Sequence, residues 1–188
     1  MNVYAEFLQR DQCVLLLVDI QSVMLDPCVD AELVKKHAAA LIDIAKLFDI
    51  PIFLSEHNAE KLGGFLPELV KKAPQAKVMS KLEFSCLENE KILRALQATG
   101  RKTLLLAGLE AHVCVFHSGA HALRLGFRVH VAADAVSSRG SRNREIGLCR
   151  LEKAGAVISS TEMIIFELLN RAGTAEFRAA LPLLKTLS

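Results

Sequence analysis

The amino-acid sequence predicts an α/β protein with a three-layer, doubly wound, mostly parallel six-stranded sheet and helices on both faces. Short apolar runs alternate with helical patterns about six times along the chain. The strand-like runs are apolar almost throughout, as expected when helices cover both faces of a parallel sheet. Because no long structureless linker and no internal repeat interrupts this alternation, we expect residues 1–188 to form a single domain.

The first predicted strand and helix set the pattern. Residues 13–20, CVLLLVDI, form a continuous aliphatic run that is typical of a fully buried strand and closes at Asp19. Residues 30–48 then carry apolar side chains at helical spacing along one face. The alternation continues through a strand at 51–55, a short helix at 66–73 and a strand at 77–80.

The second half of the chain repeats this order. A helix at 88–99, which Gly100 can end, leads into a strand at 102–108. The remaining expected elements are a helix at 114–126, a strand at 127–133, a helix at 144–155, a strand at 156–160 and a last helix at 161–172.

Composition argues against two classes of partner. The net charge is +2 and both signs are mixed along the chain, so no basic stripe suggests nucleic-acid binding. No apolar run approaches the roughly 18 residues of a membrane span, so we expect no membrane partner. The first twelve residues carry acids and lack the apolar core of a signal peptide. We therefore expect an intracellular protein, cytoplasmic in the first place, with mitochondrial import left open.

Cysteine usage and hydropathy add two expectations. The five cysteines are odd in number and irregularly spaced, so they form neither a disulfide framework nor a CxxC metal pattern, and a reducing compartment fits them best. The mean hydropathy of +0.30 is high for a monomer of this size. It predicts a buried interface between copies of the chain, that is, a homo-oligomer, either a dimer or a larger assembly.

Polar residues at the ends of predicted strands form the candidate site, because ligands of doubly wound sheets bind outside the carboxyl ends of the strands. Cys114 falls at the start of a predicted helix, where the helix dipole and free N–H groups favour a thiolate. Asp19 could accept the thiol proton, and Lys81 supplies a positive charge beside both anions. Each residue alone has a structural explanation, but together they predict a nucleophilic site. The other cysteines are expected to be structural: Cys13, Cys28, Cys86 and Cys149.

Four motifs carry a family resemblance: LLLVDIQ around Asp19, SKLEFSC around Lys81, GLEAHVCV around Cys114, and DAVSSR at 134–139. In order and spacing they resemble the isochorismatase-like cysteine hydrolase superfamily, and most closely its isochorismatase domain-containing branch. The resemblance covers residues 13–169. It implies the isochorismatase-like hydrolase fold and a catalytic triad of aspartate, lysine and cysteine.

The resemblance also implies a mechanism. Asp19 would take the thiol proton, and Lys81 would orient and balance the two anions. Cys114 would attack an amide, an ester or a related electrophile of a small molecule, amides in the first place, to form a covalent thio-intermediate that water hydrolyses. A cis peptide bond at Leu109–Glu110 would turn a backbone N–H, together with that of Cys114, toward the developing oxyanion.

Four more residues are expected at the substrate pocket from their positions. Gln21 would point its amide into the mouth, and Phe84 would form an apolar wall. His57 is either a pocket-lining residue or an ordinary loop histidine. His112 could face the pocket or partner the thiol as in papain-like enzymes, a role for which Asp19 is favoured. Glu110 would anchor an arginine or backbone groups, or contact substrate.

No catalytic metal and no cofactor are expected. Nicotinamidases of the same superfamily bind a divalent metal through an Asp-x-His motif and a second histidine, and the stretch SEHNAEKLGG at 55–64 has neither. His117 and His121 are spaced four residues apart but lack an acidic partner, so packing or solvent exposure is favoured for them. Two functions remain open: a small-molecule hydrolase, or a catalytically silent scaffold or regulatory member of the same family.

Overall fold

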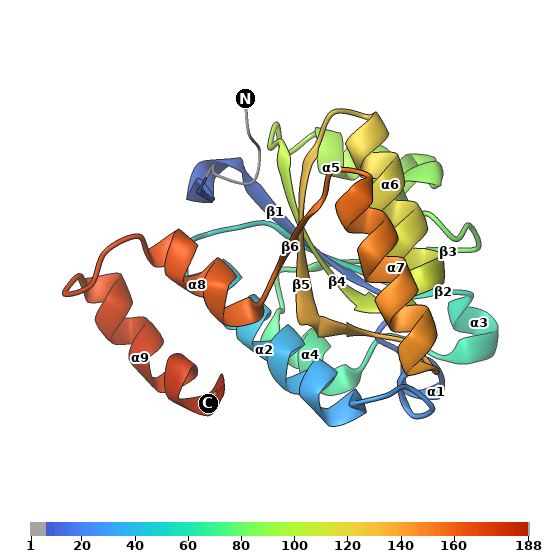
Figure 1. Ribbon diagram of the computed structural model, residues 1–188, viewed down its shortest axis with the longest axis horizontal. Coiled ribbons are helices and arrows are strands. Elements are labelled where there is room, and N and C mark those ends of the chain that lie inside the picture. Colours follow the sequence, from blue (N-terminus) through green and yellow to red (C-terminus); the bar gives the residue numbers. More distant parts are fainter. Residues whose placement is uncertain (1–6, 188) are drawn as a thin grey trace.

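The computed structural model describes residues 7–187 and has a six-stranded parallel sheet at its centre (Figure 1). The strand order is β3-β2-β1-β4-β5-β6, so the chain starts near the middle, winds out to β3, crosses back to β4 and winds out to β6. This is the doubly wound arrangement, and the predicted fold class is confirmed. The strands are β1 (Cys13–Val18), β2 (Ile52–His57), β3 (Lys77–Lys81), β4 (Thr103–Leu109), β5 (Arg128–Ser137) and β6 (Val157–Ser159).

Helices cover both faces of the sheet. On one face α2 packs against α4 and α8, and on the other α6 packs against α7 (Figure 1). The α-helices are α1 (Ser22–Leu25), α2 (Ala31–Leu47), α3 (Ala59–Leu62), α4 (Pro67–Lys72), α5 (Glu90–Gln97), α6 (Phe116–Arg124), α7 (Ser141–Lys153), α8 (Thr161–Leu169) and α9 (Ala175–Leu187). Three shorter turns are the 3-10 helices η2 (Arg10–Gln12) and η3 (Cys86–Glu88) and the π-helical turn η4 (Ala111–Val115).

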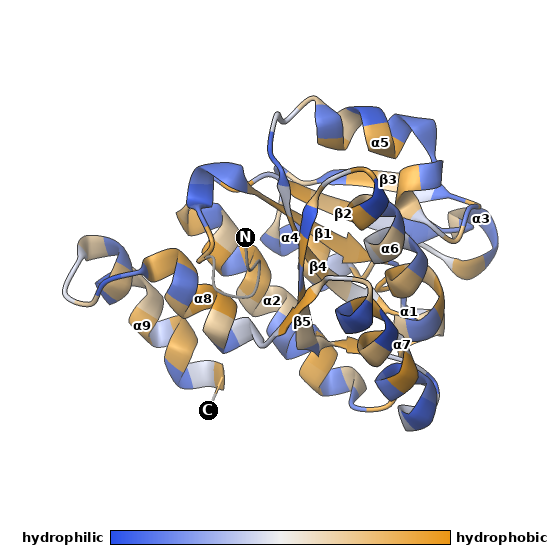
Figure 2. Ribbon diagram, turned by 45° about the horizontal axis from the view of Figure 1, so that its top comes forward, coloured by the Kyte–Doolittle hydropathy of each residue, from blue (hydrophilic) through white to orange (hydrophobic). Residues whose placement is uncertain are grey.

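The two central strands are the most apolar part of the chain. Every residue of β1 and β4 is buried, and the hydrophobic colour of Figure 2 gathers on the central strands. Near their carboxyl ends the two strands come unusually close at Gly108, which has φ +128°. A Cβ at this position would lie 2.1 Å from the carbonyl oxygen of Val18, so only glycine fits. Asp19 directly follows Val18. The close contact between the two strands therefore holds the backbone just before Asp19 in place.

Several elements differ from the sequence expectation: α1 and α3 were not expected, and α6 begins at Phe116 instead of residue 114, after the turn η4. β5 extends to Ser137 instead of ending at 133, because a register shift between Leu106 and Gly108 lets it continue pairing beside β4. The expected last helix, 161–172, is also not the last, because α9 follows it and packs against α2 and α8. Pro182 lies inside α9 and interrupts the helical pattern that the sequence would otherwise show. No helix within residues 7–187 is long and apolar enough to cross a membrane.

Candidate active site

An ion pair between Asp19 and Lys81 lies at the carboxyl ends of the strands. Asp19 directly follows β1, Lys81 ends β3, and β2 runs between them. Lys81 Nζ lies 2.7 Å from Asp19 Oδ2, and both side chains are completely buried. Burial alone would lower the pKa of Lys81, but attraction to the ionised forms of its neighbours Cys86, Asp19 and Cys114 outweighs burial and raises this pKa. Burial raises the pKa of both thiols, so Asp19 is the neighbour that supplies the negative charge at neutral pH. Lys81 therefore stays a cation and balances the buried carboxylate.

The second oxygen of Asp19 is also engaged. Ser55, which pairs with Val18 across β1 and β2, donates its hydroxyl to Asp19 Oδ1 at 2.6 Å. Cys86 Sγ lies 3.3 Å from Ser55 Oγ and donates to it, and the Cys86 N–H donates to Ser118 Oγ. Ser55 thus fixes the orientation of the Asp19 carboxylate, and Cys86 and Ser118 extend the buried polar network next to it.

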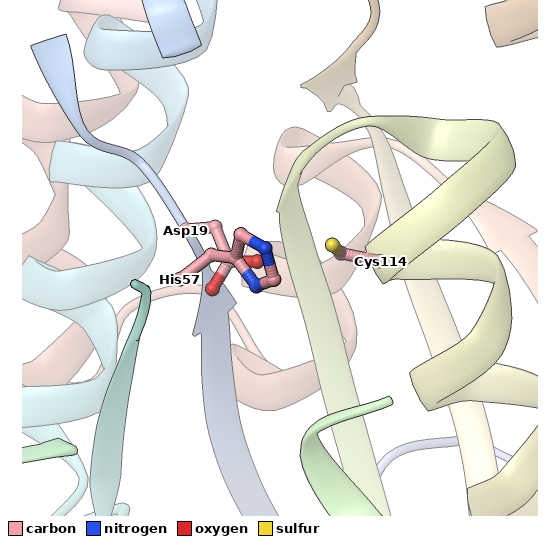
Figure 3. Close-up of side chains that lie close together, drawn as sticks. All are labelled: Asp19, His57 and Cys114. Carbon is pink, nitrogen blue, oxygen red and sulfur yellow. The ribbon is translucent and has the colours of Figure 1, made fainter. Parts of the chain in front are cut away.

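Cys114 lies in η4, the turn that joins β4 to α6, and is only 3% exposed. Its sulfur, an oxygen of Asp19 and a ring nitrogen of His57 all lie within 4.8 Å of one another (Figure 3). The sulfur of Cys114 therefore lies within 4.8 Å of the Asp19 carboxylate. The structure therefore brings together the three residues that the sequence singled out, Asp19, Lys81 and Cys114.

The resting state of the thiol differs from the sequence expectation. The helix start was expected to favour a thiolate, but burial raises the pKa of Cys114, and the neighbouring charge of Asp19 raises it further. Lys81 acts in the opposite direction without cancelling these effects. Cys114 is thus a neutral thiol at rest, and it can become a nucleophile only as its proton leaves.

The expected cis peptide bond at Leu109–Glu110 is wrong. No cis peptide bond occurs within residues 7–187. Glu110 instead adopts a left-handed conformation, with φ 56°, which turns the chain between β4 and η4. Its carbonyl oxygen accepts the N–H groups of Val113, at 2.8 Å, and Val115, at 3.2 Å. The oxyanion-binding role of the Cys114 N–H stays a prediction.

Cys114 opens into a cavity of about 300 Å³. Two of the four expected pocket residues, His57 and Phe84, line it, and their rings stack with centroids 5.7 Å apart. Glu110 and Arg139 also reach it. The rest of the lining is apolar: Val23, Met24, Pro27, Leu62 and Val113.

Gln21 has a different position from the one expected. Its side chain is fully buried instead of facing the pocket mouth. The amide nitrogen donates to the carbonyl oxygens of His57 and Gly63, and the amide oxygen accepts the N–H of His57. The side-chain nitrogen and oxygen of Gln21 thus bind the backbone at the end of β2, beyond Ser55, where the pairing with β1 has ended. Gln21 thus holds the backbone of His57 and is not among the residues that line the cavity.

His112 is also displaced from its expected place at the pocket. Its Nδ1 lies 3.4 Å from Glu110 Oε2 and 3.2 Å from Ser138 Oγ. Glu110 Oε1 accepts a hydrogen bond from Arg139 Nε at 2.7 Å, so Glu110 anchors an arginine, one of its two expected roles. This network ties the turn around Cys114 to the DAVSSR segment, whose Arg139 the sequence did not single out.

The residues with metal-ligand chemistry are Asp19, His57 and Cys114, the one such group that residues 7–187 bring together. A carboxylate, an imidazole and a thiol are ligand types that zinc accepts. Here, however, both oxygens of Asp19 already accept hydrogen bonds, one of them from the Lys81 ammonium. The positive charge that a metal would bring is thus already present, and the expectation of a metal-free site stays a prediction.

Several residues of the site gave little signal in the sequence. Ser55 could have been found from its place at the end of β2. Cys86 was expected to be structural, and nothing in the sequence indicates that it lies beside Ser55. Cys149, also expected to be structural, is exposed. Gly147 of α7 packs against the Cys114 turn so closely that a Cβ would lie 2.5 Å from the Ala111 carbonyl oxygen. No local pattern in the sequence reveals such a contact.

Comparison with known proteins identifies the family to which this chain is similar. The model of the isochorismatase domain matches residues 13–163. The secreted isochorismatase effector Isc1 of Phytophthora sojae is 37% identical over 177 residues, which are 92% of this chain and 84% of that protein. Isochorismatase domain-containing protein 2 of Rattus norvegicus is 31% identical over 180 residues, 93% of this chain and 82% of the relative.

Solved structures resemble this fold over nearly its whole length. The MAR1 ribonuclease of Caenorhabditis elegans has a TM-score of 0.90 at 26% identity, over 96% of this chain and 93% of that one. YcaC of Pseudomonas aeruginosa, solved with hexane-2,5-diol and covalent acrylamide, has a TM-score of 0.89 at 29% identity, over 95% and 92%. YcaC of Escherichia coli, described as an octameric hydrolase of unknown specificity, has 0.86 at 29%, over 96% and 88%.

Proposed function

Since this chain belongs to the isochorismatase family, we propose that it is a cysteine hydrolase that uses Cys114 as its nucleophile, Asp19 as the base and Lys81 as the fixed cation. The observation that carries the proposal is that a buried carboxylate lies beside both an ammonium and a thiol, and that the thiol lines a cavity. The two hydrogen bonds to Asp19 from Lys81 and Ser55 hold the carboxylate in place for proton transfer.

Because Cys114 is protonated at rest, loss of its proton and attack on the substrate have to occur together. Because burial raises the pKa of Cys114, the sulfur attacks the substrate carbonyl while its proton passes to Asp19. Lys81 keeps its charge throughout and offsets the negative charge that moves between carboxylate, sulfur and the carbonyl oxygen. The product of this step is a thioester on Cys114, which water hydrolyses.

The cavity favours a small, largely apolar acyl group. Its volume of about 300 Å³ is at the lower end of the range for small-molecule sites. Its charged lining residues, Glu110 and Arg139, pair with each other, so the wall offers no unbalanced charge to a strongly ionic substrate. We therefore favour a neutral amide or ester as substrate. One structural neighbour is a ribonuclease, but the net charge of only +2 gives little support for RNA binding here.

We also propose a homo-oligomer. One structural neighbour is described as octameric. In this chain the large apolar side chains Met163 and Phe166 of α8 are 56% and 47% exposed, which a contact between copies would cover. Light scattering coupled to size-exclusion chromatography gives the mass in solution. An oligomer is expected, and a monomer at micromolar concentration would contradict the proposal.

The test of the proposed function is intact-mass spectrometry of the protein after short exposure to a panel of small neutral amides and esters. We expect an acyl adduct on the wild-type chain that is absent from Cys114→Ala. The matched control is Cys149→Ala, which removes an exposed thiol away from the cavity and should keep the adduct. Adducts that persist in Cys114→Ala would overturn the assignment of the nucleophile. No adduct and no hydrolysis across the panel would favour a catalytically silent member of the family.

A further inference from the structure

We infer that His57 is the acid–base group on the substrate side of this site, protonating the leaving group and then accepting a proton from the hydrolytic water. The inference rests on the proposed function and adds a catalytic role to it. Asp19, once protonated, could return that proton to the leaving group, so the assignment to His57 depends on which of the two side chains reaches the cavity, and His57 lines it whereas Asp19 does not.

The positions of Asp19 and His57 divide the work between them. Asp19 is completely buried, and its two oxygens accept hydrogen bonds from Ser55 and Lys81. His57 lines the cavity, and one of its ring nitrogens lies within 4.8 Å of both the Cys114 sulfur and an Asp19 oxygen (Figure 3). A leaving group that departs into the cavity therefore meets His57, whereas Asp19 is not among the residues that line the cavity.

The His57 ring has a nitrogen free for this task. Its Nδ1 is buried and finds no hydrogen-bond partner within residues 7–187. A buried polar atom left without a partner is uncommon in a protein and calls for an explanation, which a partner supplied by a bound ligand would give. Imidazole is also the side chain that most readily both gives and takes a proton near neutral pH.

The surroundings hold His57 rigidly, as acid–base catalysis requires. Gln21 binds both its backbone N–H and its carbonyl oxygen, at 2.7 Å and 3.0 Å. On the side-chain end, Phe84 stacks against the ring at an interplanar angle of 19°. A residue with only a packing role does not require such precise positioning. The hydrogen bonds from Gln21 therefore favour a role in which the position of the His57 ring matters.

The proton balance closes over one turnover. The sulfur of Cys114 bonds to the carbonyl carbon as its proton passes to Asp19. The bond from that carbon to the leaving nitrogen or oxygen then breaks as protonated His57 gives that atom a proton. Water next attacks the thioester and gives a proton to neutral His57. The carbon–sulfur bond breaks, and the sulfur recovers its proton from Asp19.

Two alkylating agents test this role without knowledge of the substrate. Acrylamide adds to a thiol with negative charge developing on its amide, and the product gains a proton, so a proton donor accelerates the reaction. Iodoacetamide is a similarly small neutral amide. Its iodide departs as an anion that carries the negative charge away, so this reaction needs no proton donor. In His57→Phe, which keeps an aromatic ring against Phe84, we expect the acrylamide rate at Cys114 to fall by about 100-fold. The iodoacetamide rate should change less than about threefold.

His57→Gln separates proton transfer from simple hydrogen bonding. Its amide can donate a hydrogen bond but cannot give up a proton, so we expect the same loss of acrylamide rate as in His57→Phe. His117→Gln is the matched control, because His117 also contacts the Phe84 ring but does not line the cavity, and it should keep both rates. Peptide mass spectrometry gives the rates at Cys114.

Two results would overturn the role of His57. In one, His57→Gln keeps the wild-type acrylamide rate, which would make His57 a hydrogen-bond donor only. In the other, both reagents slow equally in both variants, which would make it a packing residue. Failure of the proposed function is distinguishable, because in that case iodoacetamide would not label Cys114 in the wild-type protein.

Discussion

Lys81 Nζ and Asp19 Oδ2 are 2.7 Å apart, and neither side chain reaches solvent. Burying either charge alone is strongly unfavourable, so each residue is stable in this place only because the other is present. The pair joins the ends of β1 and β3 across β2. It therefore belongs to the structure of the sheet as much as to the chemistry of the site.

Replacing Lys81 with methionine, which is of similar size and uncharged, should leave the buried carboxylate of Asp19 without its cation. We expect the free energy of unfolding in urea to fall by about 3–5 kcal/mol. The double variant Asp19→Asn with Lys81→Met removes both charges and should recover most of this loss. A single variant as stable as the wild type would show that the pair is not needed for folding.

Gln21→Leu should destabilise the protein and disturb His57 without changing the cavity lining directly. The substitution leaves the N–H of His57 and the carbonyl oxygens of His57 and Gly63 without their partner. Gly63 is exposed, so the loss falls mainly on the two backbone groups of His57. At about 1–3 kcal/mol for each unsatisfied group, we expect a loss of at least about 2 kcal/mol in urea unfolding. Wild-type stability together with weaker substrate binding would instead favour the contact with substrate that the sequence suggested.

Gly147→Ala should move the turn that carries Cys114. A Cβ there would lie 2.5 Å from the Ala111 carbonyl oxygen and 2.7 Å from the His112 nitrogen. We expect a loss of about 1–3 kcal/mol of stability and a clear drop in the alkylation rate of Cys114. The matched control is Gly140→Ala, at the start of the same helix, where a Cβ meets nothing within 4 Å. Equal effects of the two substitutions would contradict this account.

His130 should make stability depend on pH. Its side chain lies in β5, where burial and then the charge of Arg128 lower its pKa from 6.5 to about 4. Between these values the unfolded chain binds a proton that the folded chain does not, so stability falls as the pH drops from 6.5 towards 4. The loss should reach at most about 3 kcal/mol. Urea unfolding at several pH values measures it.

His130→Leu should flatten that part of the pH profile, because the substituted side chain has no proton to bind. The expected change is in the slope of unfolding free energy against pH between pH 6.5 and 4, whatever the effect on absolute stability. An unchanged slope in His130→Leu would show that other groups cause the acid sensitivity.

The fold was predictable because its strands are continuous apolar runs and its helices carry clear periodic patterns. The positions of Asp19, Lys81 and Cys114 were predictable for a related reason, since strand ends of a parallel sheet converge on one edge. The role of Gln21 was not, because an amide that binds backbone groups looks in the sequence like one that faces a pocket. Nor was the raised pKa of Cys114, which depends on how deeply the turn is buried.

The central claim is that Asp19, Lys81 and Cys114 work as one unit, and the iodoacetamide rate at Cys114 tests it most directly. The rate is measured by peptide mass spectrometry in the wild type, Asp19→Asn and Lys81→Met, with the exposed Cys149 as the standard within each sample. We predict that the rate at Cys114 falls at least tenfold in both variants while the rate at Cys149 stays the same. Equal rates at Cys114 in all three proteins, each shown to be folded, would contradict the claim.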